Sequence, residues 1–96
     1  MSRRLLWINP VGFDAYDKPI SDALRDEAYP DTRIDVCSLK GVKMQHLEYN
    51  AYEMVAAGPT MGAIRWGEEQ GYDAAVIGCF YDPFLRAGRE VTSKMA

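Results

Sequence analysis

Residues 72–83 read Tyr-Asp-Ala-Ala-Val-Ile-Gly-Cys-Phe-Tyr-Asp-Pro, and the rest of the chain is arranged around this stretch. Its first part, Asp73 to Gly78, is a short and almost entirely apolar run that follows the turn residue Gly71. Such a run predicts a strand that is buried on both faces. Cys79 lies where this strand ends, so we expect the strand to span residues 73–79.

The residues after Cys79 predict the start of a helix. Asp82 is a suitable N-cap and Pro83 suits the first helical position, so a helix is expected from Pro83 to about Thr92. The positive end of a helix dipole and its free N–H groups favour a thiolate over a thiol, which makes Cys79 a candidate nucleophile or base. The alternative is that Cys79 is a small buried hydrophobic residue that closes the strand.

The preceding elements alternate between strands and helices. We expect a strand over 4–9, an amphipathic helix from residue 14 or 17 to about 28, a strand over 32–39 and a helix-like segment over 48–70. Gly58-Pro59 is expected to kink the last segment or to split it into two helices, because proline removes a hydrogen bond and clashes with the preceding turn. Trp7 is expected in the core and Trp66 on the buried face of this helix.

The alternation of strands and helices predicts an α/β fold in three layers, with a parallel sheet, right-handed crossovers and helices on both faces. With flavodoxin-like strand order, the first and third strands are neighbours, and ligands bind beside their carboxyl ends. Asn9 and Cys79 close these two strands. The fold alone would therefore bring these two residues to one crevice.

Composition limits the class of protein. Ninety-six residues, 48% hydrophobic and 26% charged, predict one soluble domain over residues 1–96. A net charge of −3 without a basic block argues against a nucleic-acid partner. No signal peptide or membrane span is recognised, so cytoplasmic localisation and no membrane partner are expected. The two cysteines, Cys37 and Cys79, form no CxxC or Cys/His cluster, so neither a disulfide nor a metal site is expected.

Three stretches carry a resemblance to a known family. They are residues 71–83 with 85–90, the Ile-Asn-Pro-Val-Gly of residues 8–12, and the His-Leu-Glu-Tyr of residues 46–49 with Tyr52-Glu53. In this order they resemble the hydantoin racemase family of the aspartate/glutamate racemase superfamily. Members of that family are more than twice this length and carry a second cysteine in a second half. The chain thus resembles the N-terminal half of a pseudo-symmetric Asp/Glu racemase fold, and is expected to be truncated or half-sized.

The resemblance implies a racemase or epimerase that works without pyridoxal phosphate or any other cofactor. Racemisation needs one base on each face of a carbon next to a carbonyl, and a thiol suits this role because its reference pKa of ~8.5 can be lowered. Cys79 would be one of the two catalytic thiols. Cys37 is expected to be structural, because it lies inside its strand, beyond the first strand from Cys79.

The candidate substrate-binding residues are Asn9, Tyr49, Phe80 and Tyr81. Asn9 is assigned by the resemblance, as a donor that orients the substrate. Tyr81 could cap the pocket, and packing is the alternative for Tyr49. The expected partner is a small molecule, such as an amino acid, a hydantoin or a related carbonyl compound.

Phe13 and Phe84 depart from the family pattern, since relatives tend to carry a small hydroxyl residue and a glycine at these positions. Their rings are expected to narrow or block the pocket, or to cover apolar surface that the absent half would bury.

Two alternatives to racemisation stay open. One is a reaction with a single thiol, such as decarboxylation or maleate-type isomerisation. The other is an inactive half-domain that binds a ligand or associates with itself. An open sheet edge and an apolar helix face favour a homo-oligomer, in which two copies of Cys79 could lie across a two-fold axis.

Overall fold

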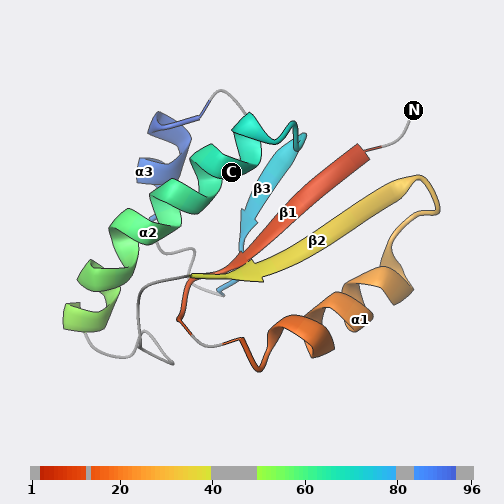
Figure 1. Ribbon diagram of the computed structural model, residues 1–96, viewed down its shortest axis with the longest axis horizontal. Coiled ribbons are helices and arrows are strands. Elements are labelled where there is room, and N and C mark those ends of the chain that lie inside the picture. The colour runs from red at the N-terminus through yellow and green to blue at the C-terminus, as the bar shows by residue number, and fades with distance from the viewer. Residues whose placement is uncertain (1–2, 13, 40–49, 80–83, 93–96) are drawn as a thin grey trace.

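The computed structural model describes residues 3–12, 14–39, 50–79 and 84–92. Strands and helices alternate along it (Figure 1), in the order β1 (Arg3–Asn9), α1 (Asp17–Glu27), β2 (Thr32–Ser38), α2 (Asn50–Glu69), β3 (Ala74–Ile77) and α3 (Leu85–Glu90). Among the described residues, no helix is long and apolar enough to cross a membrane.

The three strands form one parallel sheet in the order β2-β1-β3. The central strand β1 pairs with β2 from Arg3↔Thr32 to Asn9↔Ser38 and with β3 from Leu5↔Ala74 to Ile8↔Ile77. The first and third strands are therefore neighbours, which confirms the strand order expected from the sequence. All three carboxyl ends lie at one edge of the sheet.

One face of the sheet carries the core. Leu6 and Ile8 of β1 are buried, as are their register partners Ala75 and Ile77 of β3. Helix α2 covers this face at close range, since a Cβ at Gly67 would lie 2.8 Å from Cδ2 of Leu6. Because side chains alternate along β1, Leu6 and Ile8 face this well-packed side, and the residues between them face the other side of the sheet.

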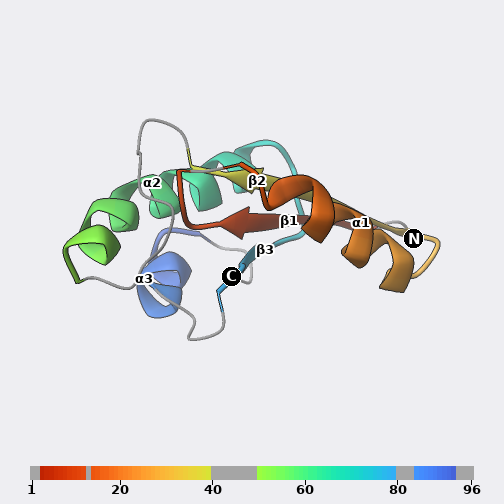
Figure 2. The same ribbon diagram turned by 90° about the horizontal axis from the view of Figure 1, so that it is seen from below.

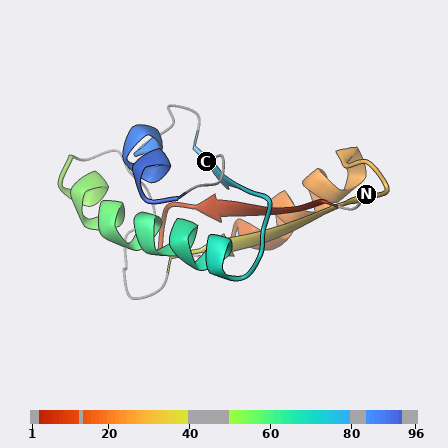
Figure 3. The same ribbon diagram turned by 90° about the horizontal axis from the view of Figure 1, so that it is seen from above.

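The second face is less completely covered. Leu5 and Trp7 of β1 and Val76 of β3 are only half-buried, and none of the eleven residues of α1, all of which are described, is buried. Helix α1 lies in front of the sheet when the molecule is seen from below (Figure 2), and α2 lies in front of it when seen from above (Figure 3). The three layers expected from the sequence are present, and they are unequally packed.

Two expectations about α2, the split and the burial of Trp66, are wrong. The helix runs unbroken from Asn50 to Glu69 with Pro59 inside it, so Gly58-Pro59 does not split it, and the alternative of a kink stays a prediction. Packing of its buried side chains against the sheet outweighs the single hydrogen bond that proline removes. Trp66 is 47% exposed rather than buried, because Ile64 and Gly67 are the residues that face the sheet.

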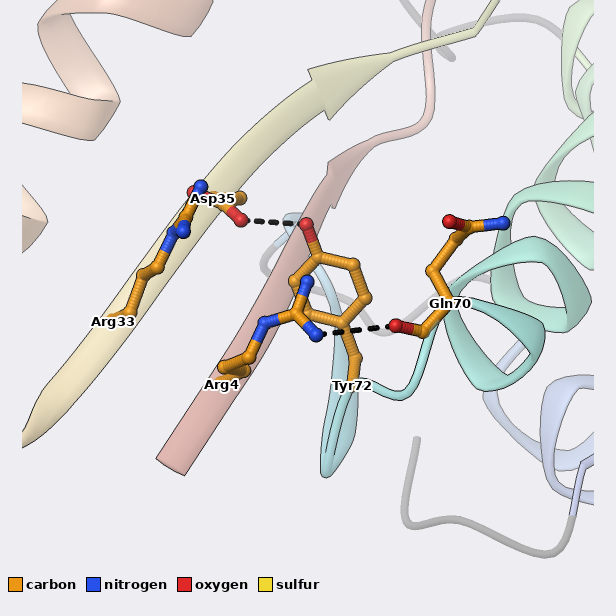
Figure 4. Close-up of polar contacts among 5 residues, drawn as sticks. All are labelled: Arg4, Arg33, Asp35, Gln70 and Tyr72. Atoms are coloured by element: carbon orange, nitrogen blue, oxygen red, sulfur yellow. Dashed lines mark hydrogen bonds and ion pairs between the residues drawn. The ribbon is translucent and has the colours of Figure 1, made fainter. Parts of the chain in front are cut away.

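A group of polar side chains ties the strands together near their amino-terminal ends (Figure 4). The Tyr72 hydroxyl donates to Oδ2 of Asp35 at 2.5 Å, and the guanidinium of Arg4 lies 4.4 Å from the centre of the Tyr72 ring. Arg4 also donates to the carbonyl of Gln70, and Arg33 pairs with Asp35 at 3.0 Å. We call these five residues the tyrosine cluster; it links β1, β2 and the segment that joins α2 to β3.

The charges of the tyrosine cluster shift two pKa values. Partial burial by itself would raise the pKa of Asp35, but hydrogen bonds from Tyr72 and Arg33 and the positive charges of Arg33 and Arg4 outweigh it, so this pKa lies below its ordinary value of 3.8. Burial and the hydrogen bond to Asp35 raise the pKa of Tyr72 above its ordinary value of 10.0. Both shifts favour the folded pair at neutral pH.

Candidate functional site

The candidate site lies at the edge of the sheet where the three strands end. Asn9 is the last residue of β1 and is paired in register with Ser38, the last residue of β2. On the other side, the backbone N–H of Gly78 donates to the carbonyl of Ile8 at 2.8 Å, so the segment after β3 stays beside β1 for one more residue. Cys79 follows immediately, and its N–H donates to the carbonyl of Ile77 at 2.9 Å. The topology therefore puts Asn9 and Cys79 at the ends of adjacent strands.

The Asn9 side chain is held by hydrogen bonds at both ends of its carboxamide. The indole Nε1 of Trp7 donates to Oδ1 of Asn9 at 2.9 Å, and Nδ2 of Asn9 donates to Oδ1 of Asp17 at 2.9 Å. The Ser38 hydroxyl donates to the other carboxylate oxygen of Asp17 at 3.2 Å. We call these four residues the asparagine cluster; it joins β1, β2 and the first turn of α1.

Asn9 is 4% exposed, so its carboxamide is a buried polar group that hydrogen bonds compensate. The sequence did not indicate the partners. Trp7 was expected only as a core residue, and Asp17 only as one of two possible starts of a helix. Alternation along β1 places Trp7 and Asn9 on the same side of the strand, and this was the signal that could have suggested their contact.

Gly78 is required by the close approach of Trp7. A Cβ at this position would lie 2.2 Å from Nε1 of Trp7 and 3.0 Å from Oδ1 of Asn9. Distances this short cannot be relieved without moving the indole or the asparagine. The glycine therefore makes room for the asparagine cluster.

Cys79 is a free, half-buried thiol, but the helix expected directly behind it is not where the sequence placed it. Helix α3 begins at Leu85, with Phe84 rather than Asp82 as its N-cap and no capping hydrogen bond from a side chain, and it ends at Glu90 rather than Thr92. It has only six residues, and it begins six residues after Cys79. The described helix therefore does not provide the dipole at Cys79 that the sequence had suggested.

Phe84 has a left-handed backbone conformation, with φ 63°. This region is unfavourable for a residue with a Cβ and is readily adopted by glycine. The ring is half-buried and packs against the core. Its packing against apolar side chains offsets the backbone strain. Phe13, the other departure from the family pattern, lies outside the described residues.

Three more candidate residues, Tyr49, Phe80 and Tyr81, lie outside the described part of the chain, so their roles stay predictions.

Cys37 is half-buried on β2 and is paired in register with Ile8. It lines a cavity of about 360 Å³ together with Ser38, Leu39 and, from α2, Pro59, Gly62, Ala63 and Trp66. Strand β1 lies between this strand and β3. The strand order therefore places Cys37 beyond β1 from Cys79, as the sequence predicted. Among the described residues, no group of three or more His, Cys, Asp or Glu side chains is arranged to hold a metal ion.

Comparisons with known proteins support one family. The chain is 40% identical over 88 residues to a hydantoin racemase from Pseudomonas sp. (strain NS671), which covers 91% of this chain and 34% of the relative. It is 49% identical over 45 residues to a hydantoin racemase from Rhizobium meliloti, covering 47% of this chain and 19% of that one. Its structure matches an allantoin racemase from Klebsiella pneumoniae with a TM-score of 0.81 and 42% identity, over 93% of this chain and 36% of that chain.

Over the segment that it matches, the chain is similar to hydantoin racemases and to an allantoin racemase. The resemblance seen in the sequence motifs is confirmed, and so is the α/β fold that it implied. The chain spans 34% of the length of the Pseudomonas hydantoin racemase and 36% of the length of the allantoin racemase. No protein-family model matches it.

Proposed function

We propose that this chain takes part in cofactor-independent racemase or epimerase chemistry on a cyclic ureide of the hydantoin or allantoin type, with Cys79 as an acid/base thiol. The observation that carries the proposal is the match at 42% identity and a TM-score of 0.81 to an allantoin racemase over 93% of this chain. The match leaves out only 7% of the chain, and Cys79 follows the last of the three strands.

In the proposed step, the thiolate of Cys79 removes the proton from the substrate carbon that lies next to a carbonyl. The electron pair of the broken C–H bond moves to the carbonyl oxygen and forms an enolate, while the sulfur becomes a thiol. Return of a proton to the same face restores the starting enantiomer; return to the opposite face requires a second acid. Racemisation thus needs two acid/base groups, one on each side of the carbon.

Racemisation by this chain would require a second acid/base group besides Cys79. The only other thiol in the sequence is Cys37, and the central strand separates its strand from the end of β3. We therefore expect the 96-residue chain to exchange the proton of one enantiomer with solvent and to retain its configuration, rather than to racemise it.

The test is proton exchange in D₂O, measured by mass spectrometry and chiral chromatography on each enantiomer of allantoin separately, against a blank without protein. We expect deuterium to enter one enantiomer with retention of configuration. The rate should fall roughly 100-fold or more in Cys79→Ser, as for the loss of a general acid/base. Cys37→Ser is the matched control and should leave the rate unchanged. Equal rates in the wild type and Cys79→Ser would exclude the thiol mechanism.

A second function is favoured by the incompletely covered face of the sheet. Leu5, Trp7 and Val76 are only half-buried there, and α1 has no buried residue. On α2, which covers the other face, Met54 and Val55 are 78% and 57% exposed. Such surfaces favour self-association, in which two copies of the chain would bring two Cys79 thiols to one substrate. Sedimentation equilibrium at micromolar protein would detect a dimer; monomers alone would exclude this arrangement.

A further inference from the structure

The asparagine cluster contains two residues that the racemase proposal does not use, Trp7 and Asp17. The indole N–H of Trp7 is a donor only, and an ionised carboxylate such as that of Asp17 is an acceptor only. Asn9 can satisfy both contacts in one orientation of its carboxamide, with Oδ1 toward Trp7 and Nδ2 toward Asp17. Chemistry as well as geometry thus fixes which end of the carboxamide faces which partner.

Asp17 is itself held in place. Its second carboxylate oxygen accepts the hydrogen bond of Ser38 at 3.2 Å, and it begins α1, an eleven-residue helix whose first turn favours a negative charge. The loop between β1 and α1 is anchored as well, because the N–H of Leu39 donates to the carbonyl of Val11 at 2.9 Å. The acceptor for the Asn9 amide is therefore part of a fixed frame at the ends of β1 and β2.

We propose that Asp17 and Trp7 are positioning residues that hold the Asn9 carboxamide with its second N–H available to a carbonyl oxygen of the substrate. This inference rests on the proposed function. Among the described contacts, one N–H of Asn9 is used by Asp17, and the other is not engaged. A hydrogen bond accepted at Oδ1 polarises the amide and strengthens the remaining N–H as a donor.

Such a donor would stabilise the negative oxygen of the enolate that forms when the proton leaves. Because the amide orientation is set before the substrate arrives, no reorganisation is needed during the reaction. Asn9 would touch the substrate, whereas Asp17 and Trp7 would act only through Asn9.

The test follows the two side-chain N–H signals of Asn9 by ¹⁵N–¹H NMR during titration with allantoin. The Asn9 signals are assigned by their loss in Asn9→Asp. In the wild type we expect these signals to move as allantoin binds. In Asp17→Asn, which keeps the shape but replaces the charged acceptor with a neutral carboxamide that can turn its NH2 toward Asn9, the Asn9 signals of the free protein should shift and allantoin should bind about tenfold more weakly, the usual scale for one hydrogen bond to a charged group.

Ser38→Ala is the matched control, because it removes a hydrogen bond to Asp17 without touching Asn9; binding should weaken less than threefold, as expected for the loss of a weaker, indirect contact. Trp7→Phe should weaken allantoin binding and shift the Asn9 signals. Thermal unfolding of each variant shows whether the chain is folded under the conditions of the titration.

The proposal is overturned if allantoin does not move the Asn9 signals of the wild type, or if Asp17→Asn binds allantoin as tightly as the wild type. Failure of the proposed function gives a different result, in which allantoin moves the Asn9 signals but exchange of its proton does not depend on Cys79. Positioning by Asp17 would then stand, while the thiol mechanism would be excluded.

Discussion

Two polar clusters hold the same sheet, and they differ in how their charges are balanced. In the tyrosine cluster, the carboxylate of Asp35 faces the cation of Arg33 and the hydroxyl of Tyr72, with Arg4 stacked on the ring. In the asparagine cluster, the carboxylate of Asp17 receives hydrogen bonds only from neutral donors among the described contacts.

We infer from this difference that the tyrosine cluster stabilises the sheet, whereas the asparagine cluster orients a group for the proposed chemistry. In the tyrosine cluster, Arg33 and Asp35 neutralise each other within β2, and the hydroxyl of Tyr72 ties Asp35 to the segment before β3, so the cluster offers no oriented group to a ligand. A carboxylate that binds a neutral amide fixes the direction of that amide instead. The first arrangement lies near the amino ends of the strands, and the second lies at the carboxyl ends, where ligands bind in open α/β sheets. Mutations in the two clusters should therefore have different consequences.

The largest effect is expected for Gly78→Ala. The new methyl group would lie 2.2 Å from Nε1 of Trp7, so the indole must move and the asparagine cluster must break. We expect the free energy of unfolding to fall by about 2–3 kcal/mol, as for an overpacked core, together with loss of allantoin binding. Urea unfolding measures the first quantity and NMR titration the second.

Gly62→Ala is the control for this change, because a Cβ at Gly62 meets nothing within 4 Å and the residue lies within α2. Alanine should stabilise the helix there by up to about 1 kcal/mol. If Gly78→Ala were as stable as Gly62→Ala, the close approach of Trp7 would not constrain the strand ends.

The next effect is expected for Tyr72→Phe in the tyrosine cluster. The change removes the hydrogen bond to Asp35 and should lower the free energy of unfolding by about 1–2 kcal/mol at neutral pH. Allantoin binding and proton exchange should stay unchanged, since the cluster lies away from the strand ends. A variant that lost either activity would show that the two clusters are not independent.

The pH dependence of this difference follows from the two pKa shifts. The pKa of Asp35 is lowered in the folded state, so its contribution is present above the unfolded value and is lost as the pH falls below ~4. The pKa of Tyr72 is raised, so its contribution is present below the unfolded value and is lost as the pH rises above ~10. The difference in the free energy of unfolding between the wild type and Tyr72→Phe should thus be largest between about pH 4 and about pH 10. Urea unfolding at pH values inside and outside these limits measures this difference. A difference that stays constant with pH would mean that Asp35 and Tyr72 are not coupled.

The smallest effect is expected at Phe84, and it is a difference in stability between its glycine and alanine variants. Phe84→Ala loses the packing of the ring and keeps the strained backbone, whereas Phe84→Gly loses the same packing and relieves the strain at φ 63°. We expect the glycine variant to be more stable than the alanine variant by about 1 kcal/mol. Thermal unfolding of the two proteins compares them directly, and a more stable alanine variant would mean that the left-handed conformation carries no strain.

The sequence predicted the sheet because hydrophobic runs and turn residues report directly on burial. The strand order, and with it the adjacency of Asn9 and Cys79, was expected from the flavodoxin-like topology that alternating strands and helices suggest, and the structure has this order. The helix after Cys79 was predicted too early because local cap preferences for Asp82 and Pro83 do not include the packing that starts α3 at Leu85.

The asparagine cluster could not be predicted in the same way. The contact between Asn9 and Asp17 depends on how the loop after β1 returns α1 to the sheet, and the need for glycine at position 78 depends on the rotamer of Trp7. The burial predicted for Trp66 is wrong because Ile64 and Gly67 are the residues of this turn that face the sheet.

The most direct test of the account compares the rate of solvent deuterium exchange into allantoin for the wild type, Cys79→Ser and Tyr72→Phe under identical conditions. We predict that exchange falls roughly 100-fold or more in Cys79→Ser and stays at the wild-type rate in Tyr72→Phe, because the proposed chemistry lies at the carboxyl ends of the strands. Exchange that survives the loss of the Cys79 thiol, or that falls equally in both variants, would contradict it.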